Sequence, residues 1–419
     1  MKKKVLIPIL AAAVVVAGIL TFTFKKPGKI DGFEEAVTTV NSIEIPEGTR
    51  IVGLGEATHG NKEFQELKLE VFQTLVEKTN VRALILEGDF GGCAKANKYI
   101  LGGEGTAEEV TRDLGYRIYR TDEMCALVQW MHDYNMTAPE DQKVRLYGMD
   151  IQRAMNAKNL IKEMYAAVDE GKCADYSDRM DQFVGVEDYE FGNTDYDKAV
   201  SLMDEIAGDI QANKEAYAGK TSIDEVELCE QATVAIKCYL DLNLKDNYSS
   251  KFRDTCMKEF VDWTLEREER EYKSELMMAC HNGHMTQSFS SAATFLGTFL
   301  NEEYGDAYFA IGTDYYITHD NLPSNDTRVV KKFCSDDKLA YQVKNMDEDK
   351  YYIDFSQVDS NSKLGNVVNK RMKMGSLGEQ YNIMVRLLSM SNSIRYTPSD
   401  LYDAMIVYYE VTPIEIWNN

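Results

Sequence analysis

A carboxylate and an imidazole that could do acid–base chemistry stand three residues apart in the segment 53–60, which reads GLGEATHG. Glu56 and His59 follow a short apolar run, and glycines at 53, 55 and 60 bracket them. A strand that ends in a glycine-supported turn and then opens a helix is where an α/β protein displays reactive side chains. We therefore expect Glu56 and His59 to begin an active site.

Further polar side chains follow the ends of other predicted strands. Apolar runs of strand length are 50–54, 81–86, 144–149, 276–280 and 307–311. Just past their carboxyl ends stand Glu56 and His59, Glu87 and Asp89, Asp150, His281 and His284, and Thr313 and Asp314. The carboxyl ends of parallel strands face one edge of a sheet, where ligands bind. We therefore expect these side chains to meet, although each alone has a structural reading, such as Asp150 as a helix cap.

The chemistry of this set is that of water activated by a general base. A carboxylate would fix the imidazole tautomer, and a second histidine or a cation would stabilise the developing oxyanion. Cys280 is a candidate nucleophile, but strand alternation points it away from His281, which favours core packing.

The same histidines and glutamates could instead bind a divalent metal, and their spacing does not distinguish metal-free from metal-assisted hydrolysis. A binding protein without turnover is a third possibility.

The elements that must position these residues alternate between strand and helix. An amphipathic helix with Phe64 and Leu67 on its apolar face follows the first strand, and 108–135 predicts one or two helices before the third. This order predicts an α/β fold with a central, mostly parallel sheet flanked by helices. Residues 152–272 have helical periodicity throughout, which predicts a large all-helical insertion. It is either a wall over the site or a peripheral bundle.

The carboxyl-terminal third has a less regular pattern. Residues 338–343 and 351–355 look like strands, and 404–411 like a last strand. Residues 360–380 look like a mobile loop with some basic residues.

Composition excludes some classes of partner. The chain has 419 residues and a formal net charge of −23. Because no basic surplus exists to release counterions, we expect no nucleic-acid partner. The eight cysteines contain no C-x-x-C pair, so most are expected to be small buried hydrophobes.

The amino terminus predicts export. Three lysines precede the uncharged run 5–24, which is long enough to cross a membrane as a helix. Lysines on that side favour a single-pass anchor in the cell membrane with the catalytic domain outside the cell. A cleaved signal peptide, and hence a secreted domain, is the competing reading. We thus expect an anchor or signal segment at 1–26, a polar linker at 27–49 and the α/β domain at 50–419.

Several motifs together resemble the erythromycin esterase family. They are the opening segment 53–60 with Glu63-Phe64 after it, 86–90 (LEGDF), 146–150 (LYGMD), Arg253-Asp254 and 281–284 (HNGH). The resemblance runs from about residue 35 to 415. It implies an α/β fold with a helical insertion, a small-molecule substrate and hydrolysis of a macrolactone or related ester by activated water.

The resemblance also implies roles for individual residues. His59 would be the general base and Glu56 its partner, while Glu87, His281 and His284 would polarise the ester or hold the water. We expect Lys68, Asp89, Asp150 and Arg253 to contact the substrate. The family usually has arginine where this chain has Lys68, and lysine lacks the bidentate fork. The resemblance assigns no metal ligand in this chain. We therefore expect no cofactor with certainty, and a divalent metal stays possible.

Overall fold

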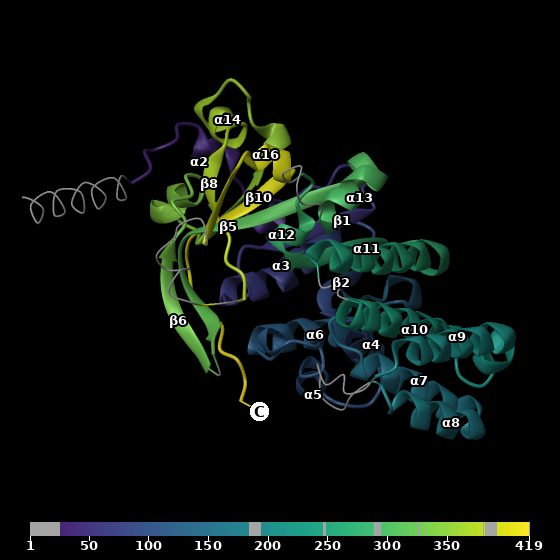
Figure 1. Ribbon diagram of the computed structural model, residues 1–419. Coiled ribbons are helices and arrows are strands. Elements are labelled where there is room, and N and C mark those ends of the chain that lie inside the picture. The colour runs from purple at the N-terminus through teal and green to yellow at the C-terminus, as the bar shows by residue number, and fades with distance from the viewer. Residues whose placement is uncertain are drawn as a thin grey trace, which may run out of the picture.

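The protein folds around a mostly parallel sheet, as predicted. The computed structural model describes residues 26–183, 194–245, 249–288, 295–325, 327–379, 381 and 392–418. Eight strands of these residues form the sheet in the order β3-β2-β4-β1-β5-β10-β7, with β6 beside β5 (Figure 1). They are β1 (Ile51–Glu56), β2 (Val81–Asp89), β3 (Arg145–Asp150), β4 (Glu275–His281), β5 (Tyr308–Ser324), β6 (Thr327–Cys334), β7 (Lys350–Asp354) and β10 (Ala404–Val411).

Five neighbouring strand pairs are parallel, and the two outer partners are antiparallel. Strand β1 pairs in parallel with β4 and β5, β2 with β3 and β4, and β10 with β5. Strand β7 runs antiparallel to β10, and β6 antiparallel to the second half of β5. The carboxyl ends of β1, β2, β3 and β4 therefore lie at one edge.

Apolar side chains of the sheet alternate between two cores. On β2, Ala83 and Ile85 belong to one buried cluster, and Leu84 and Leu86 to the other. The first core packs against helices of the insertion, and the second packs against α3 (Lys62–Lys78) and α6 (Asp122–Asn135). Cys280 lies in the first core, as strand alternation predicted. Helices α4 (Phe90–Ile100) and α5 (Ala107–Thr111) complete this part of the fold.

The region predicted as a helical insertion is helical wherever it is described. It contains α7 (Met155–Val168), α8 (Glu170–Met180), α9 (Tyr196–Ala218), α10 (Ile223–Leu244), α11 (Ser250–Arg267) and the turn η4 (Glu268–Tyr272). Figure 1 shows α7 to α10 extending to one side of the sheet, with α11 lying closest to the strands. A fully buried ion pair between Arg145 of β3 and Glu268, 2.7 Å long, ties the last turn to the sheet.

The carboxyl-terminal third differs from two predictions. Residues 338–343 are not a strand but lie largely in the 3-10 turn η6 (Ala340–Asn345), because the Asp337 carboxylate accepts the backbone N–H groups of Leu339 and Ala340. Residues 360–380 are not a loop throughout: they contain α14 (Lys363–Val368) and β8 (Met372–Gly375), which pairs with β9 (Ser393–Tyr396). The remaining short helices are α2 (Phe33–Ala36), α12 (Asn282–Met285), α13 (Leu296–Tyr304) and α16 (Pro398–Leu401).

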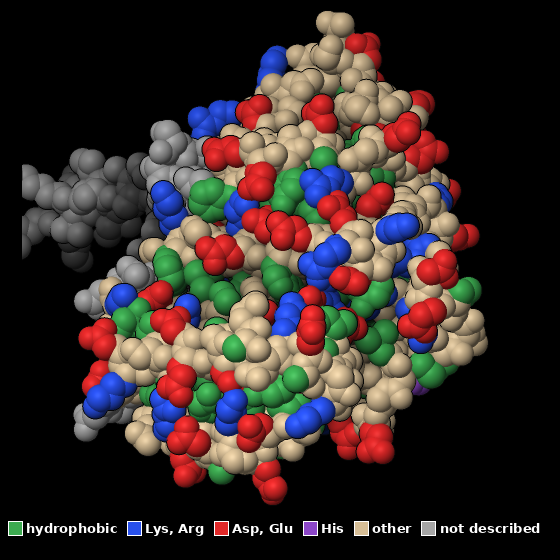
Figure 2. Space-filling model, turned by 90° about the vertical axis from the view of Figure 1, so that its right-hand side faces the viewer, with side chains coloured by type: hydrophobic (Ala, Val, Ile, Leu, Met, Phe, Trp, Pro, Cys, Tyr) green, Lys and Arg blue, Asp and Glu red, His purple; other side chains and the backbone are tan. Residues whose placement is uncertain are grey.

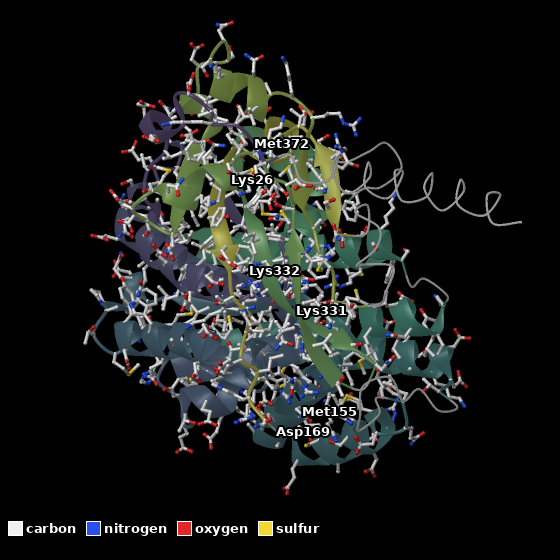
Figure 3. The ribbon with its side chains drawn as sticks, turned by 90° about the vertical axis from the view of Figure 1, so that its left-hand side faces the viewer. Lys26, Met155, Asp169, Lys331, Lys332 and Met372 are labelled. Carbon is white, nitrogen blue, oxygen red and sulfur yellow. The ribbon has the colours of Figure 1, made fainter. Side chains whose placement is uncertain are left out.

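Strand β5 continues past its pairing with β1 and β10 and forms a long hairpin with β6. Figure 3 shows this ribbon with Lys331 and Lys332 on β6. Its pairs run from Ile317 opposite Cys334 to Ser324 opposite Thr327. The predicted fifth strand ended at 311, so the sequence pattern found only its first part.

The amino-terminal predictions fall mostly outside the described residues. The predicted membrane segment 1–26 is described only at Lys26, so the anchor and the export of the chain stay predictions. In the part of the chain with described structure, no helix combines the length and apolarity that a membrane span requires. The linker ends against the domain, where Thr38 forms an isolated antiparallel bridge with Tyr352.

Candidate active site

The carboxyl ends of the central strands surround one cavity. Glu56, the last residue of β1, is in register with His281, the last residue of β4. Glu87 follows Leu86 of β2, which pairs with Ala279 of β4. A cavity of about 490 Å³ opens there, lined by His59, Glu87, Tyr116, Arg117, Ile118, Tyr119, Gln152, Arg253, His281, His284, Arg328, Gly378 and Glu379. The expectation that side chains from several strand ends meet is therefore fulfilled by the geometry.

His59 is held by a buried carboxylate that a buried lysine supports. The Nδ1 atom of His59 lies 2.5 Å from Oε1 of Glu56. The ammonium of Lys68, only 2% exposed, donates to the other oxygen of Glu56 and lies 3.2 Å from Oε1 of Gln65. Helix α3 carries Lys68 two turns after its start, so its side chain reaches back under the strand end. The imidazole, the carboxylate and the ammonium form one chain.

The contacts among Lys68, Glu56 and His59 set the charges of Glu56 and His59. Burial opposes ionisation of Glu56, but Lys68 and His59 prevail and lower its pKa to about 2. Burial also opposes a charged His59, but its hydrogen bond to Glu56 and the charges of Glu56 and Glu87 raise its pKa to about 9. At neutral pH the pair is therefore an imidazolium beside a carboxylate.

A second imidazole lies across the cavity in a different network. His284 has Nδ1 at 2.8 Å from Oδ1 of Asp254, and its Nε2 lies 2.9 Å from Nη1 of Arg253. Because arginine only donates, Nε2 of His284 accepts and its proton sits on Nδ1. The acid Asp254 also accepts the backbone N–H of Leu296, the first residue of α13. A single carboxylate thus orients both an imidazole and a helix start.

Arg253 joins three strand ends. Its Nη2 donates to Oε1 of Glu87 at 2.6 Å and to Oδ2 of Asp150 at 2.7 Å, and its Nε donates to Oδ1 of Asp150 at 3.0 Å. Burial opposes the charge of each carboxylate. Arg253 nevertheless holds the pKa of Asp150 below its usual value, and cationic neighbours, Arg253 among them, hold the pKa of Glu87 well below its own. The insertion supplies this residue from α11, so one helix of it forms a wall of the site.

His281 is a neutral imidazole next to His59. Its Nδ1 accepts the backbone N–H of Gly283 at 3.1 Å, and its Nε2 lies 3.3 Å from the carbonyl oxygen of Leu377. The proton therefore sits on Nε2. Burial and the charge of His59 lower the pKa of His281 to about 4. The two rings have their centroids 4.9 Å apart, which sets a charged imidazole beside a neutral one.

The turn after β4 is held by an amide that crosses over β1. Asn282 donates from Nδ2 to the carbonyl oxygen of Thr313 at 2.7 Å, and its Oδ1 accepts the backbone N–H of Thr313 at 3.2 Å. This side chain lies over Gly55, where a Cβ atom would collide with Oδ1 of Asn282. The glycine is needed for this close approach, which fixes His281 beside Glu56.

Some predicted site residues do not line the cavity. Lys68 lies behind Glu56 and contacts that carboxylate, not the open space. Asp89 caps α4 by accepting the backbone N–H of Gly92, and it also accepts from Asn156. Asp150 lies behind Arg253, and the buried Asp314 accepts the backbone N–H of Gly375 instead. Of the four residues expected to contact substrate, only Arg253 is placed to do so.

Other cavity residues were not found from the sequence. Tyr116, Arg117 and Tyr119 belong to the turn η2 (Arg117–Tyr119) and its cap, which lie within the range 108–135 predicted as helical and carry no motif. Arg328 and Glu379 pair across the cavity wall from β6 and the segment after β8. The carboxylate that faces His284 belongs to Asp254, which stood in the sequence next to Arg253, and that adjacency was the available signal.

A metal-binding geometry is not found among the described residues. There, no three histidine, cysteine or acidic side chains converge as metal ligands would. The carboxylate oxygens of Glu56 face His59 and Lys68, and those of Glu87 face Arg253 and the backbone N–H of His281. These lone pairs are used by donors of the protein itself, so the donor set does not fit a metal as it stands.

Comparisons with known proteins agree with the fold and the motifs. The sequence profile of the erythromycin esterase family matches residues 76–411. The erythromycin esterase type II of Escherichia coli is 25% identical over 305 residues, which are 65% of this chain and 70% of that protein. Among solved structures, a Bacillus cereus protein superposes with a TM-score of 0.74 at 22% identity, covering 92% of this chain and 98% of that one. A mutant of the erythromycin esterase EreC in its open conformation superposes with a TM-score of 0.63 at 18% identity, covering 89% and 93%.

The profile match covers most of the chain and includes Glu87, Arg253, His281 and His284. The segment with Glu56 and His59 lies ahead of the matched residues, and the register of β1 with β4 brings it to the same cavity. The resemblance seen in the sequence is thus confirmed, and the chain belongs to the erythromycin esterase family of hydrolases.

Proposed function

We propose that this protein hydrolyses a carboxylic ester, with a macrolactone as one substrate class, by water that His59 activates. The observation that carries the proposal is the chain from Lys68 through Glu56 to Nδ1 of His59. Because Glu56 holds Nδ1, the other ring nitrogen, Nε2, is the atom left to take a proton from water. Since His59 lines the cavity, that water would stand beside a bound substrate.

The reaction uses the two neighbouring imidazoles differently. Nε2 of His59 takes a proton as the water oxygen attacks the carbonyl carbon, and the carbonyl oxygen becomes an oxyanion. The neutral His281 offers its Nε2 proton to that oxyanion, because its only protein partner is a long contact with Leu377 in the described part of the chain. When the tetrahedral intermediate collapses, the imidazolium of His59 returns the proton to the leaving alkoxide.

The raised pKa of His59 fits the second half of this cycle better than the first. With a pKa of about 9, roughly one imidazole in a hundred is free to act as base at pH 7. The same pKa makes the imidazolium persist until the alkoxide needs a proton. Stabilisation by Glu56 therefore lowers the share of active enzyme at neutral pH and favours product formation afterwards.

Two features support a bulky ester as substrate. The cavity of about 490 Å³ has the size of a site for a drug-sized molecule. Its wall combines tyrosine and isoleucine side chains with the polar groups described above. The relative from Escherichia coli is named as an erythromycin esterase, and we extend lactone opening to this chain on that ground.

The test is hydrolysis by the full chain, purified in mild detergent, of a panel of macrolactones and simple esters, followed by mass spectrometry. The wild type should open at least one of them, and His59→Ala should reduce the rate to background. Each assay is repeated with a chelator, and an unchanged rate is expected. If the wild type leaves the whole panel untouched, the proposal is wrong.

We also propose that the domain acts outside the cell, held by the segment 5–24. The lysines ahead of this uncharged run support that orientation. Fractionation of cells that express the full chain, with protease added to intact cells, should find the domain in the membrane fraction and accessible to protease. Recovery of protected protein from the cytosol would contradict the proposal.

A further inference from the structure

We propose that the cavity contains an anion-binding subsite centred on Arg117, so that the substrate is an ester with a negatively charged group. This inference rests on the proposed function and specifies its substrate class. It follows from how the charged groups of the cavity wall are paired.

The other cations of the wall have carboxylate partners. Arg253 contacts both Glu87 and Asp150, each within 2.7 Å. Arg328 holds both oxygens of Glu379, at 2.9 and 3.0 Å. The third cation, His59, lies 2.5 Å from Glu56.

Arg117 differs from them. It lines the cavity with an exposed side chain, and it makes no ion pair or hydrogen bond through its guanidinium within the described ranges of the chain. The two acids of the wall, Glu87 and Glu379, are already engaged by Arg253 and Arg328. A free guanidinium in a site of paired charges is a positive group that a ligand can neutralise.

The surroundings of Arg117 add positive charge. Arg120 follows it by three residues, and Arg153 lies over the ring of Tyr116 with its guanidinium carbon 5.5 Å from the centroid. Burial and then the charges of Arg153, Arg117 and Arg112 lower the pKa of Arg120, while Asp113 opposes them. On the face of the molecule in Figure 2, lysine and arginine side chains lie among acidic ones.

The turn that carries Arg117 is fixed to the catalytic edge. Tyr116 donates its hydroxyl to Asp150, and Tyr119 donates to the backbone carbonyl of Glu87 at 3.0 Å. The backbone N–H of Trp417 donates to the carbonyl of Arg120 at 2.8 Å. Because both tyrosines anchor to the strand ends that hold Arg253, the turn that carries Arg117 is fixed at the wall of the same cavity as His59. A planar guanidinium binds carboxylate and phosphate through paired hydrogen bonds.

The experiment compares matched esters with the full chain. The anionic set contains the 4-nitrophenyl half esters of succinate, glutarate and adipate, and a glutarate analogue that carries phosphonate at its far end. The neutral set contains the corresponding methyl 4-nitrophenyl diesters, and a trimethylammonium ester supplies the cationic case. The three spacers cover the unknown separation of the ester from the charge. The proteins are the wild type, Arg117→Gln, Arg117→Lys and the control Arg270→Gln, which removes an arginine from η4 at the opposite end of the strands.

The quantity measured is the ratio of kcat/KM for the anionic ester to that for its neutral partner. For the best spacer we expect a ratio of about ten or more in the wild type, lost in Arg117→Gln, partly kept in Arg117→Lys and unchanged in Arg270→Gln. The cationic ester should be the poorest substrate. The carboxylate and phosphonate arms then tell which anion the subsite prefers.

The outcomes separate the two proposals. If the esters are hydrolysed but the ratio is near one, or is the same in Arg117→Gln, the subsite is refuted while the hydrolase stands. If no ester is hydrolysed, binding of the glutarate half ester is measured by calorimetry. The two proteins compared are His59→Ala and the double variant His59→Ala with Arg117→Gln. Binding about tenfold weaker to the double variant supports the subsite. Equal binding, or binding to neither, overturns it.

Discussion

Replacing Glu56 by glutamine tests whether the buried lysine chooses the tautomer of His59. The ammonium of Lys68 can only donate, so it will hold the amide oxygen of the new side chain. The amide NH₂ group must then face Nδ1 of His59, which becomes an acceptor and carries its proton on Nε2. That nitrogen can no longer take a proton from water. A wrong tautomer of this kind costs about 10⁴ in kcat in the Ser-His-Asp triads of proteases, or about 5 kcal/mol of barrier.

The geometry also predicts a rescue. With Lys68→Met added to Glu56→Gln, nothing fixes the amide, which can rotate and present its oxygen to Nδ1 of His59. We expect the single variant Glu56→Gln to lose 10³- to 10⁴-fold in kcat/KM, and the double variant to recover at least tenfold of that loss. The single variant also leaves the ammonium buried without its anion, which costs about 3–5 kcal/mol of unfolding free energy, and the double variant should regain part of it.

The assay is steady-state hydrolysis of the best substrate at pH 9, with urea unfolding of each protein in parallel. Lys68→Met alone is the control, because it keeps the Glu56–His59 hydrogen bond. If Glu56→Gln is as active as the wild type, or if the double variant recovers stability but no activity, the orientation of His59 by this chain is not what limits the reaction.

Three other perturbations test separate parts of the site. Because His59 has a pKa of about 9 and acts only when deprotonated, kcat/KM should rise about tenfold per pH unit from pH 6 to 8 and level off near 9. The stability from its pairing with Glu56 is complete between pH 4.5 and 6.5 and is lost as the pH rises to 9. A kcat/KM profile that is flat from pH 6 to 9 contradicts the assignment. Arg253→Lys keeps the charge but cannot reach both Glu87 and Asp150, so kcat/KM should fall about a hundredfold and the unfolding free energy by about 2–3 kcal/mol, in contrast to a mild effect of Arg270→Lys. Gly55→Ala should displace the Asn282 amide and cost about 2–4 kcal/mol in urea unfolding, and a stability change below 0.5 kcal/mol, roughly the level of surface substitutions, would show that the amide bridge yields easily.

His59, Glu87, His281 and His284, which follow predicted strand ends, all line the cavity. Their prediction from the sequence required only that the apolar runs ending before Glu56, Glu87 and His281 be parallel neighbours, and parallel order follows from the alternation of strands and helices. The family motifs pointed to the same edge. The helical insertion was also predictable, because its amphipathic period extends over many turns.

What the sequence did not predict depends on single side chains or on distant partners. Residues 338–343 are apolar enough for a strand, but Asp337 caps a helical turn there. The strand β8 exists only because β9 pairs with it. The position of Lys68 behind Glu56 follows from the crossing of α3 under β1, which no spacing rule gives. The turn with Arg117 interrupts the helices predicted over 108–135, and its place on the cavity wall follows from the two anchoring tyrosines.

The place of β4 in the sheet has a consequence for how the protein is made. Strand β4 lies between β1 and β2, yet it follows β2 along the chain only after all of residues 90–274. While the ribosome produces these residues, β1 and β2 have no shared partner, and their inner edges are open to other chains. The catalytic edge, which needs His281 and His284, cannot assemble until this late strand enters the middle of the sheet. We therefore expect slow folding, dominated by long-range pairing, and nascent chains that end before residue 275 should be prone to aggregate.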